Sequence, residues 1–441
     1  MLKSVIISRV KEEKMKTLIQ QVKGTREFYP SQMEIRRWLY SKIEEVSIRY
    51  GYQEYDGPFL EKIELYAAKS GEELVKEQAF VFPDRGGDLI TLRPELTPSL
   101  ARMVAEKQNE LVYPIRWWSF GPFWRYERPQ KGRTREFFQW NIDLIGADSP
   151  EADAELVAIC ASFLRTIGIT PDQVKILVNH RKLVDQELFA LGIESDLKKE
   201  VFHLIDRHEK MKKEDWESSA KEMGLTQQQI VGVVEIMQDK ELWRKSPELI
   251  RVFSALESLG VSEYVAYDPK IIRGLDYYTG IVFEAWDVGG DGRAALGGGH
   301  YDNLVGDVGG KPLAGVGFAM GDVMITLLLE KYNKLPVSSQ YKDCVLVTVF
   351  DESLLTSSLT FAAELRKNGI KTIFYPEIAK LQKQLKFADR LGIHTAIVIG
   401  PDEENLGNLA IKDLPHGTQE VVKRSEAIDK IKHLLAQQSR V

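Results

Sequence analysis

Residues 117–146 decide the fold of this chain and read WWSFGPFWRYERPQKGRTREFFQWNIDLIG. Aromatic residues that favour strands fill the first part of this stretch, where Gly121-Pro122 interrupts them. In the last part, apolar and polar residues alternate. Successive side chains of a strand point to opposite faces, so a strand here places three polar residues on one face, namely Gln139, Asn141 and Asp143. We therefore predict two strands joined by a loop, with a polar pocket along the second strand.

The loop between the two predicted strands is strongly basic. It holds two glutamates and five basic residues, Arg125, Arg128, Lys131, Arg133 and Arg135. Planar guanidinium groups suit phosphates and a neighbouring aromatic ring suits a stacked base, so the loop favours a nucleotide site. The same composition also fits a solvated, charged hairpin of an ordinary sheet, and composition alone leaves both interpretations open.

The whole chain has the composition of an ordinary globular protein. It has 441 residues, of which 44% are hydrophobic and 28% charged, enough for two or three domains. The net charge of −6 does not indicate a nucleic-acid binder, so any RNA contact must come from a local patch such as the basic loop. The two cysteines, Cys160 and Cys344, lack metal-ligand spacing and indicate a reducing, cytoplasmic environment. No apolar run approaches the roughly 20 residues of a membrane span.

Two stretches connect the chain to a known family. Residues 124–139, WRYERPQKGRTREFFQ, resemble motif 2 of class II aminoacyl-tRNA synthetases, and RPQKGR at 128–133 is similar to the loop of bacterial histidyl-tRNA synthetases. Residues 273–280, RGLDYYTG, resemble a signature peculiar to the histidyl enzymes. The resemblance implies a ligase that activates L-histidine with ATP to histidyl-adenylate and pyrophosphate, and then transfers histidine to the 3′ end of histidine tRNA.

The resemblance covers nearly the whole chain from Met15 and implies an α+β fold, with an antiparallel sheet, flanking helices and a helical insertion. The implied parts are an N-terminal extension (1–14), a catalytic core in two pieces (15–180 with motifs 1 and 2, 263–332 with the histidine signature and motif 3), a helical insertion (181–262), a linker (333–342) and an α/β anticodon-binding domain (343–441). The insertion is implied to touch the tRNA acceptor stem. A solvated helical insertion without a function of its own also fits its residues. Beyond the linker, the alternation of strands and helices itself predicts a separate α/β domain.

The segment from Met33 to Pro58 is implied to be motif 1. Apolar residues at helical spacing run from Met33 to Arg49, and the chain is then extended as far as Pro58. In this class of enzymes motif 1 builds the dimer interface, so the resemblance implies a homodimer. From the residues alone, an amphipathic helix that packs within its own subunit is the simpler interpretation.

The resemblance assigns the ATP site to basic and aromatic residues. Activation is the attack of a carboxylate on the α-phosphorus, so two anions must be positioned and the growing charge neutralised. The implied catalytic residues are Arg125, which binds the α-phosphate and the histidine carboxylate, and Arg273, which approaches the same phosphate from the other side. The remaining implied ATP contacts are Phe137 stacked on adenine, Glu127 at its amino edge and Arg133 on the outer phosphates. We expect Mg²⁺ on the β- and γ-phosphates, and no metal site made by the protein itself.

A site that selects histidine must pair both imidazole nitrogens. Asp143 is implied to accept from one nitrogen and Tyr278 to pair with the other, so that side chains without this pair are rejected. The other implied histidine contacts are Gln139, Glu95 and Thr97 at the α-amino group, and Tyr277 and Tyr301 as walls of the pocket. Taken alone, each tyrosine also fits a satisfied aromatic residue on a strand. Arg128 and Gln130 are implied to read the acceptor end of the tRNA.

Two departures from the family pattern concern this site. Many members carry Glu where this chain has Asp143. The family usually shows Gly-Leu-Glu-Arg after the strand of motif 3, with its Arg on the γ-phosphate, whereas residues 321–324 here are Gly-Asp-Val-Met. We expect Met324 in the first turn of a helix that begins near Asp322, no compensating role for His300, and an active enzyme with a modest affinity for ATP.

Two other functions remain compatible with the residues. One is a non-catalytic paralogue, such as the synthetase-like regulatory subunit of histidine biosynthesis. Those proteins typically lack the C-terminal domain and a complete RGLDYY, and this chain has both. The other is an RNA-binding or sensing module built on the same core. Histidine-dependent exchange between ATP and pyrophosphate distinguishes all three.

Overall fold

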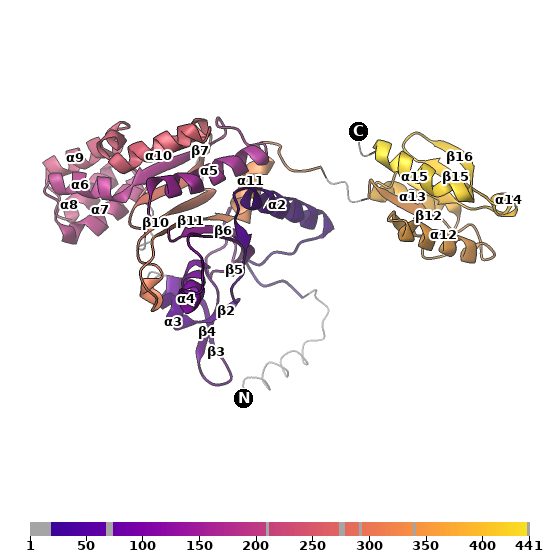
Figure 1. The fold of residues 1–441 in the computed structure, drawn as a ribbon, viewed down its shortest axis with the longest axis horizontal. Helices are drawn as coiled ribbons and strands as arrows, with labels where there is room; N and C mark the ends of the chain where they lie inside the picture. The colour runs from indigo at the N-terminus through magenta and orange to yellow at the C-terminus, as the bar shows by residue number, and fades with distance from the viewer. Residues whose placement is uncertain are drawn as a thin grey trace. The chain divides into compact units, whose positions relative to one another are not determined.

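The computed structural model describes residues 19–67, 74–208, 211–272, 278–290, 293–337 and 341–438. The chain forms two compact units, one of residues 1–27 and 37–335 and the other of residues 28–36 and 336–441. Each unit has its own sheet and hydrophobic core. Both units mix helices and strands (Figure 1), which confirms the expected α+β class.

The first unit is built on an eight-stranded sheet in the order β1-β5-β6-β11-β10-β9-β7-β8. Its strands are β1 (Gln53–Glu54), β5 (Ile115–Trp124), β6 (Glu136–Ile145), β7 (Val174–His180), β8 (Val265–Tyr267), β9 (Ile281–Asp287), β10 (Leu296–Tyr301) and β11 (Gly315–Gly321). All neighbours are antiparallel except the two edge pairs, β1 with β5 and β7 with β8. The predicted strand–loop–strand is the antiparallel β5–β6 pair, the second and third strands of this order.

Strand β5 runs unbroken through Gly121-Pro122, which interrupts its strand-favouring residues in the sequence. The amide of Trp124 donates to the carbonyl of Arg93, on the side of β5 away from β6. Backbone N–H groups two residues apart point the same way along a strand, so the nitrogen of Pro122 also faces away from β6. Its missing N–H therefore removes no hydrogen bond between β5 and β6.

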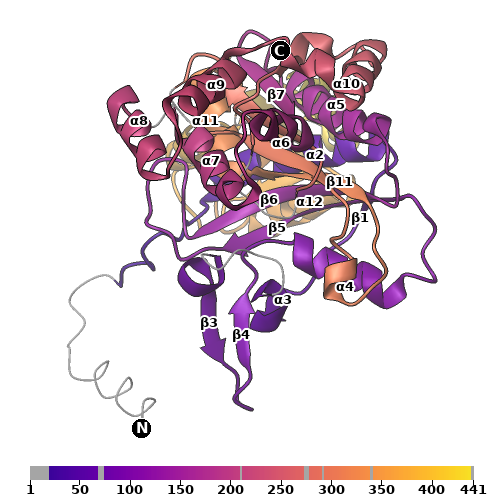
Figure 2. The same ribbon diagram turned by 90° about the vertical axis from the view of Figure 1, so that its left-hand side faces the viewer.

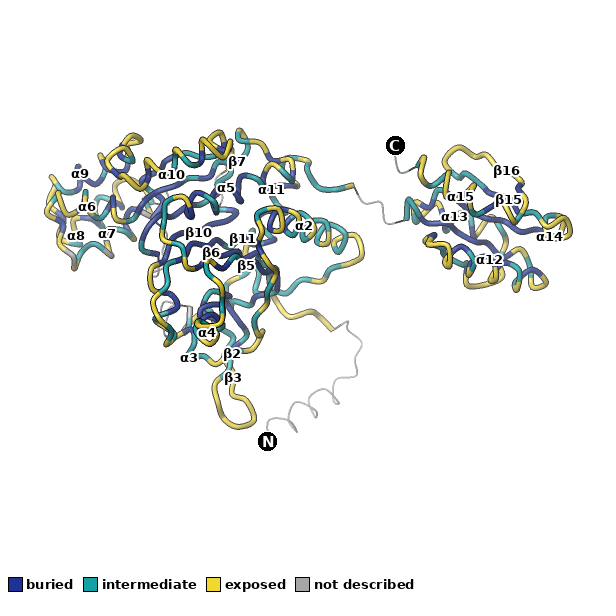
Figure 3. The backbone as a smooth tube through the Cα atoms, viewed as in Figure 1, coloured by how far each residue is buried: buried dark blue, intermediate teal, exposed yellow. Residues whose placement is uncertain are grey.

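Three helices cover one face of the large sheet: α2 (Pro30–Arg49), α5 (Pro150–Thr166) and α11 (Asp322–Lys331). The sheet contributes Trp118, Trp140 and Ile142 to the core beneath them, and the ring of Trp140 lies 5.1 Å from that of Phe163 on α5. Helix α5 begins where Ser149 accepts a hydrogen bond from the amide of Ala152, a standard N-cap. Figure 3 shows the strands of this sheet as the most buried part of the unit.

The opposite face of the sheet carries α4 (Thr97–Lys107) and a smaller antiparallel sheet in the order β2-β4-β3 (Figure 2). Its elements are β2 (Leu60–Lys62), α3 (Ile63–Ala67), a π-helical turn (Leu74–Gln78), β3 (Phe80–Pro83) and β4 (Leu89–Leu92). The chain leaves β4 at Arg93 and enters α4 at Thr97. The predicted segment Leu92-Arg93-Pro94-Glu95 therefore connects the small sheet with α4.

The segment between β7 and β8 is helical, as the sequence indicates. It consists of α6 (Arg181–Ala190), α7 (Ser195–Arg207), α8 (Lys213–Glu222), α9 (Gln227–Gln238), a 3₁₀ turn (Leu242–Lys245), α10 (Pro247–Ser258) and a second 3₁₀ turn (Ser262–Tyr264). Thr226 and Gln229 form a capping box at the start of α9, and Ser246 caps α10. Trp216 is buried, and its indole N–H donates to the carbonyl of Leu204 at 2.8 Å, which joins α8 to α7.

The second unit contains a five-stranded sheet in the order β13-β12-β14-β15-β16. Its elements are β12 (Cys344–Val347), α12 (Leu355–Lys367), β13 (Lys371–Phe374), α13 (Leu381–Leu391), β14 (Thr395–Val398), α14 (Pro401–Asn405), β15 (Asn408–Asp413), β16 (Thr418–Lys423) and α15 (Arg424–Gln438). The fully buried Gln384 on α13 bonds the amide and carbonyl of Val349 and so fixes α13 to the end of β12. Among the helices of the described ranges, none is both long and apolar enough to span a bilayer.

Candidate active site

The face of the large sheet opposite α2, α5 and α11 carries the polar residues of β6 and a strip of small residues. Gln139, Asn141 and Asp143 share this face, because they alternate with the core residues Trp140 and Ile142. Their partners across the register on β11 are Gly321, Ala319 and Gly317. Ala319 and Gly317 in turn face Gly297 and Gly299 on β10. The backbone of β11 and β10 is therefore nearly bare beside the polar side of β6, so larger groups can lie directly against it.

Asp143 and Tyr301 occupy part of that bare surface. The hydroxyl of Tyr301 donates to Oδ1 of Asp143 at 3.0 Å, across the intervening strand β11. A Cβ on Gly317 would overlap the Asp143 carboxylate, and one on Gly315 would lie 2.7 Å from the Tyr301 ring. The two glycines are thus required for this pair to form.

The environment of Asp143 changes its titration. Its side chain is 5% exposed, and burial raises its pKa to about 7, against the opposing hydrogen bond from Tyr301. Tyr278 is also buried, and its ring lies 2.8 Å from the position of a Cβ on Gly299. A buried carboxylate that accepts from one tyrosine hydroxyl, with a second buried tyrosine on the same side of the sheet, suits a ligand with N–H donors.

Arg125 lies at the other end of the same side of β6. Its Nε donates to the carbonyl of Pro94 at 2.9 Å, and its guanidinium lies 5.5 Å from the centre of the Phe137 ring. Pro94 precedes the buried Glu95, so this contact joins the loop after β5 to the start of α4. No hydrogen bond within the described ranges engages the two terminal Nη groups of Arg125. They are oriented by the Nε contact and the ring, and remain able to bind an anion.

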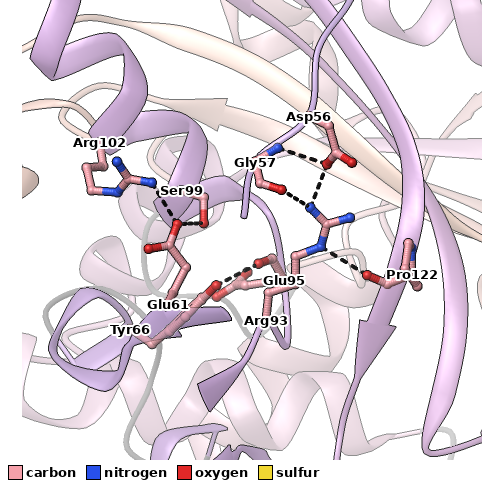
Figure 4. A network of polar contacts seen from close by, with 9 residues as sticks. All are labelled: Asp56, Gly57, Glu61, Tyr66, Arg93, Glu95, Ser99, Arg102 and Pro122. Carbon is pink, nitrogen blue, oxygen red and sulfur yellow. Dashed lines mark hydrogen bonds and ion pairs between the residues drawn. The ribbon is translucent and has the colours of Figure 1, made fainter. Parts of the chain in front are cut away.

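Arg93 fixes this corner of the site (Figure 4). It is fully buried; its Nε donates to the carbonyl of Pro122 at 3.0 Å, and its Nη1 donates to Oδ1 of Asp56 at 2.6 Å. Its guanidinium lies between the rings of Phe59 and Phe123, 4.5 and 4.6 Å from their centres. A Cβ on Gly121 would overlap its Nη2. Arg93 therefore ties the segment that carries Glu95 to β5.

A second set of polar contacts in Figure 4 holds α4 against the small sheet. Oε1 of Glu61 accepts from the hydroxyl of Ser99 at 2.9 Å and from Arg102 at 2.7 Å. The hydroxyl of Tyr66 donates to the backbone carbonyl of Glu95 at 3.3 Å. The buried Glu95 and the partly buried Thr97, both predicted to hold an α-amino group, thus lie on a rigid connection.

The basic loop between β5 and β6 turns tightly at Lys131-Gly132. Gln130 and Arg133 exchange both backbone hydrogen bonds across this turn, at 3.1 and 2.8 Å, and Gly132 has φ +80°. Arg133 forms an ion pair of 2.9 Å with Glu127, which is mostly buried. Arg128 and Gln130 are exposed on the loop. Glu127 and Arg133, which were predicted to bind the adenine edge and the outer phosphates, are therefore paired with each other. The two residues predicted to contact tRNA are accessible to solvent.

The residues that follow β11 differ from the family pattern and have structural partners here. Helix α11 begins at Asp322, so Met324 lies in its first turn, as predicted. The Asp322 carboxylate accepts from Arg26 at 2.9 Å and from the amide of Phe138 at 2.9 Å. The sulfur of Met324 would lie 2.5 Å from a Cβ on Gly132. The start of α11 is therefore packed against both the tip of the basic loop and the first residues of β6.

His300 faces away from the polar side of β6. It pairs with Val316 across the sheet, on the face that α5 covers. Its Nδ1 lies 2.9 Å from Asp153 on α5, and its Nε2 lies 3.1 Å from Asp302. Burial by itself lowers the pKa of His300, but the hydrogen bond and charge of Asp153, aided by Asp302 and Asp148, raise it overall. That His300 does not compensate for Met324 stays a prediction.

Three residues with the attributes of site residues escaped the sequence analysis as individual candidates. Asn141 is buried and Tyr55 is half-buried with a buried hydroxyl, and neither Nδ2 of the one nor the hydroxyl of the other has a hydrogen-bond partner within the described ranges. Burial, followed by the charge of Asp143, raises the pKa of Tyr55 well above its usual range, which places Tyr55 near that carboxylate. The period-two pattern of β6 places Asn141 on the polar face and could have identified it as a candidate. No pattern in the sequence around Tyr55 indicates that Tyr55 lies near the site. The third, Arg293, lies just before β10.

The structure brings most of the predicted residues to one side of the sheet. Asp143, Tyr301 and Tyr278 gather at one end of β6, Arg125 and Phe137 lie at the other, and Gln139 lies between them. Arg273 and Tyr277 lie outside the described residues. Chemically, the arrangement offers a buried carboxylate with hydroxyl groups at one end and oriented guanidinium groups beside an aromatic ring at the other.

Known proteins resemble this chain over most of its length. The family model of histidyl-tRNA synthetase matches residues 24–323, and that of an anticodon binding domain matches residues 343–434. The chain is 34% identical to the histidine–tRNA ligase of Leptospira biflexa over 97% of the chain and 100% of that protein. It is 37% identical to the chloroplastic/mitochondrial histidine–tRNA ligase of Arabidopsis thaliana over 92% of the chain and 85% of the relative.

Two solved structures share the fold. The crystal structure of histidyl-tRNA synthetase from Nostoc sp. PCC 7120 superposes with a TM-score of 0.80, covering 95% of this chain and 100% of that one at 24% identity. A Bacillus halodurans protein described as an ATP phosphoribosyltransferase regulatory subunit/histidyl-tRNA synthetase superposes with a TM-score of 0.69, covering 84% and 94% of the two chains at 21% identity. At these identities the superpositions show a common fold.

Proposed function

Because the chain belongs to the histidyl-tRNA synthetase family, we propose that the polar side of β6 is the place where it activates L-histidine with ATP. It is an aminoacyl-tRNA ligase that joins histidine to histidine tRNA. In the first step a carboxylate oxygen of histidine attacks the α-phosphorus of ATP, and the bond to the bridging oxygen breaks as pyrophosphate leaves. In the second step the adenylate transfers histidine to the 3′ end of the tRNA.

The buried pair of Asp143 and Tyr301 is the observation that carries the proposed histidine site. The carboxylate accepts an N–H of the imidazole, and the buried Tyr278 pairs with the second ring nitrogen. A side chain without two such nitrogens leaves these buried groups unsatisfied, which makes its binding unfavourable by orders of magnitude. Gln139, Glu95 and Thr97 hold the α-amino group, and Tyr277 and Tyr301 wall the pocket. Asn141 and Tyr55 supply further polar atoms on the same side.

The ATP site is proposed at the Arg125 end of β6. Arg125 binds the α-phosphate and the histidine carboxylate, and Phe137 stacks on the adenine. Glu127 and Arg133, paired with each other without ligand, separate when Glu127 takes the adenine amino group and Arg133 the outer phosphates. Arg273 completes the charge around the α-phosphate. Mg²⁺ accompanies ATP on its β- and γ-phosphates, where it neutralises charge, and we assign the ion no protein ligand.

The second step requires contacts with tRNA. Arg128 and Gln130, exposed beside the tip of the basic loop, are proposed to contact the acceptor end of histidine tRNA. The C-terminal unit, which matches an anticodon binding domain, is proposed to contact the anticodon. We further propose that the protein is a cytoplasmic homodimer that uses Met33 to Pro58 at its interface, and that residues 181–262 form an insertion beside the acceptor stem.

Histidine-dependent ATP–pyrophosphate exchange tests the proposal against a regulatory paralogue that shares the fold. We expect exchange that requires histidine and falls by ~100-fold or more in the Arg273→His variant, by analogy with the removal of a single transition-state charge donor. Exchange that is absent from the wild-type protein at every ATP concentration would assign the chain to the non-catalytic class. Near-normal exchange in a folded Arg273→His variant would reject the role of that arginine.

A further inference from the structure

Arg293 lies at the edge of the sheet where the proposed ATP site ends. Two residues separate it from β10, and the amide of the second, Ala295, already donates to the carbonyl of Ala285 on β9. Leu296, the first residue of β10, pairs with Met320 near the end of β11, which runs directly into α11. The register therefore brings Arg293 to the same edge as the first turn of α11, where Met324 packs on the basic loop at Gly132.

The guanidinium of Arg293 is incompletely satisfied. Its Nη1 is buried without a hydrogen-bond partner, and Arg293 forms no ion pair with any residue that the structure describes. Burial, and next the charge of Arg133, lower its pKa, and the charge of Glu127 opposes them. Glu127 is itself paired with Arg133. Glu127 therefore pairs with Arg133 and not with Arg293. A half-buried guanidinium whose buried Nη1 has no acceptor among the described residues favours the binding of an anion.

The position of Arg293 indicates which anion binds there. Arg125 holds the inner end of the site, beside Phe137, whereas Arg133 and Arg293 lie farther along, at the loop. Met324 packs at this outer end and carries no charge. We propose that Arg293 binds the β- and γ-phosphates of ATP and thereby supplies the cationic contact that Met324 lacks. The inference rests on the proposed function, because that function supplies ATP as the nucleotide. It adds Arg293 as a specific ligand of the outer phosphates of ATP.

A binding experiment without catalysis tests the inference. ATP and AMP are titrated calorimetrically into the full-length protein with Mg²⁺ and no histidine. AMP lacks the two outer phosphates, so Arg293→Gln should weaken ATP binding by ~10- to 100-fold, the usual effect of one charged hydrogen-bonding group, and change AMP binding less than about twofold. The matched control is Arg244→Gln, whose side chain is exposed and paired with Glu241 in the helical insertion; it should change neither affinity.

Several outcomes would overturn the inference. An equal loss for ATP and AMP would make Arg293 a structural residue, and unchanged ATP binding would remove it from the site. A change confined to the KM for tRNA in aminoacylation would place a tRNA phosphate at Arg293 instead. By contrast, wild type that binds ATP through Arg293 but shows no histidine-dependent exchange would reject the proposed function and retain this inference.

Two further variants keep the test decisive if Arg293→Gln folds poorly. Arg293→Lys keeps the charge but loses the planar fork, so ATP binding should weaken by only a few-fold while AMP binding stays the same. In the double variant Arg293→Gln/Met324→Arg, the new guanidinium extends from α11 toward the same phosphates. It should recover about tenfold in ATP affinity over Arg293→Gln alone. No recovery in a folded double variant, or equal losses for both nucleotides in Arg293→Lys, would contradict the assignment.

Discussion

The hydroxyl of Tyr301 on β10 donates a hydrogen bond of 3.0 Å to Oδ1 of Asp143 on β6, over the bare backbone of Gly317. The bond joins two strands that are not neighbours in the sheet and fixes the carboxylate at the floor of the proposed histidine site. Because Asp143 is buried, its pKa of about 7 lies far above its ordinary value. The pair is therefore expected to affect both the selection of histidine and the pH dependence of the free energy of unfolding.

The first prediction concerns stability and pH in the Asp143→Asn variant. The native pKa of Asp143 is raised, so its contribution to stability is fully present below the unfolded pKa of about 3.9 and is lost as the pH rises through about 7. Asparagine keeps an acceptor for Tyr301 but does not ionise. Relative to wild type, the free energy of unfolding of the variant should rise by about 2 kcal/mol between pH 5 and pH 8. Urea titrations at both values measure this, and a difference that does not change with pH would contradict it.

The second prediction concerns His300. Both ring nitrogens face carboxylates, Asp153 at 2.9 Å and Asp302 at 3.1 Å, and both donate only when the ring is charged. The pKa of His300 is raised, so its stabilisation is fully present below the unfolded pKa of about 6.5 and is lost as the pH rises through the native pKa. His300→Gln should therefore reduce the free energy of unfolding by about 1–2 kcal/mol at pH 6, and by clearly less at pH 9. Equal losses at both values in urea titrations would exclude a charged His300.

The third prediction concerns the space that Gly121 leaves for Arg93. A methyl group on Gly121 would overlap Nη2 of Arg93, which is buried between Phe59 and Phe123. Gly121→Ala should lower the free energy of unfolding by about 1–3 kcal/mol, the usual effect of overpacking. Gly321→Ala is the matched control, because it has nothing within 4 Å of its Cβ and an ordinary φ of −78°. Chemical denaturation that finds the two variants equally stable would show that Arg93 is free to move.

The fourth prediction separates the tRNA step from activation. Gln130 is exposed, and among the residues that the structure describes it is bonded only through its backbone, to Arg133 across the turn. Gln130→Ala should therefore leave the loop folded and slow aminoacylation by ~10-fold while pyrophosphate exchange remains normal. Equal losses in the two assays would move Gln130 into the ATP site.

The sequence predicted those parts of the fold that depend on local pattern. The alternation along β6 placed Gln139 and Asp143 on one face, because a strand leaves no other choice. Asp322 was correctly predicted to begin a helix. The alternation of strands and helices predicted beyond the linker is present from β12 to β14 of the C-terminal unit.

Other features depend on contacts between distant segments, and the sequence did not indicate them. The sequence does not show why β5 continues through Gly121-Pro122, which depends on the nitrogen of Pro122 facing away from β6. The unsatisfied hydroxyl of Tyr55 and the buried Nη1 of Arg293 become apparent only once the strands are placed. Whether a side chain finds a hydrogen-bond partner depends on how separate strands are arranged, and the sequence pattern of one segment does not contain that information.

The central claim is that the carboxylate of Asp143 selects histidine in the activation step. The most direct test is the kcat/KM for histidine in ATP–pyrophosphate exchange, measured for wild type and for Asp143→Asn. A neutral amide accepts the imidazole N–H less strongly than a carboxylate does, so kcat/KM for histidine should fall by about 100-fold in the variant, with the KM for ATP unchanged. An Asp143→Asn protein that exchanges pyrophosphate with the wild-type kcat/KM for histidine would contradict the account.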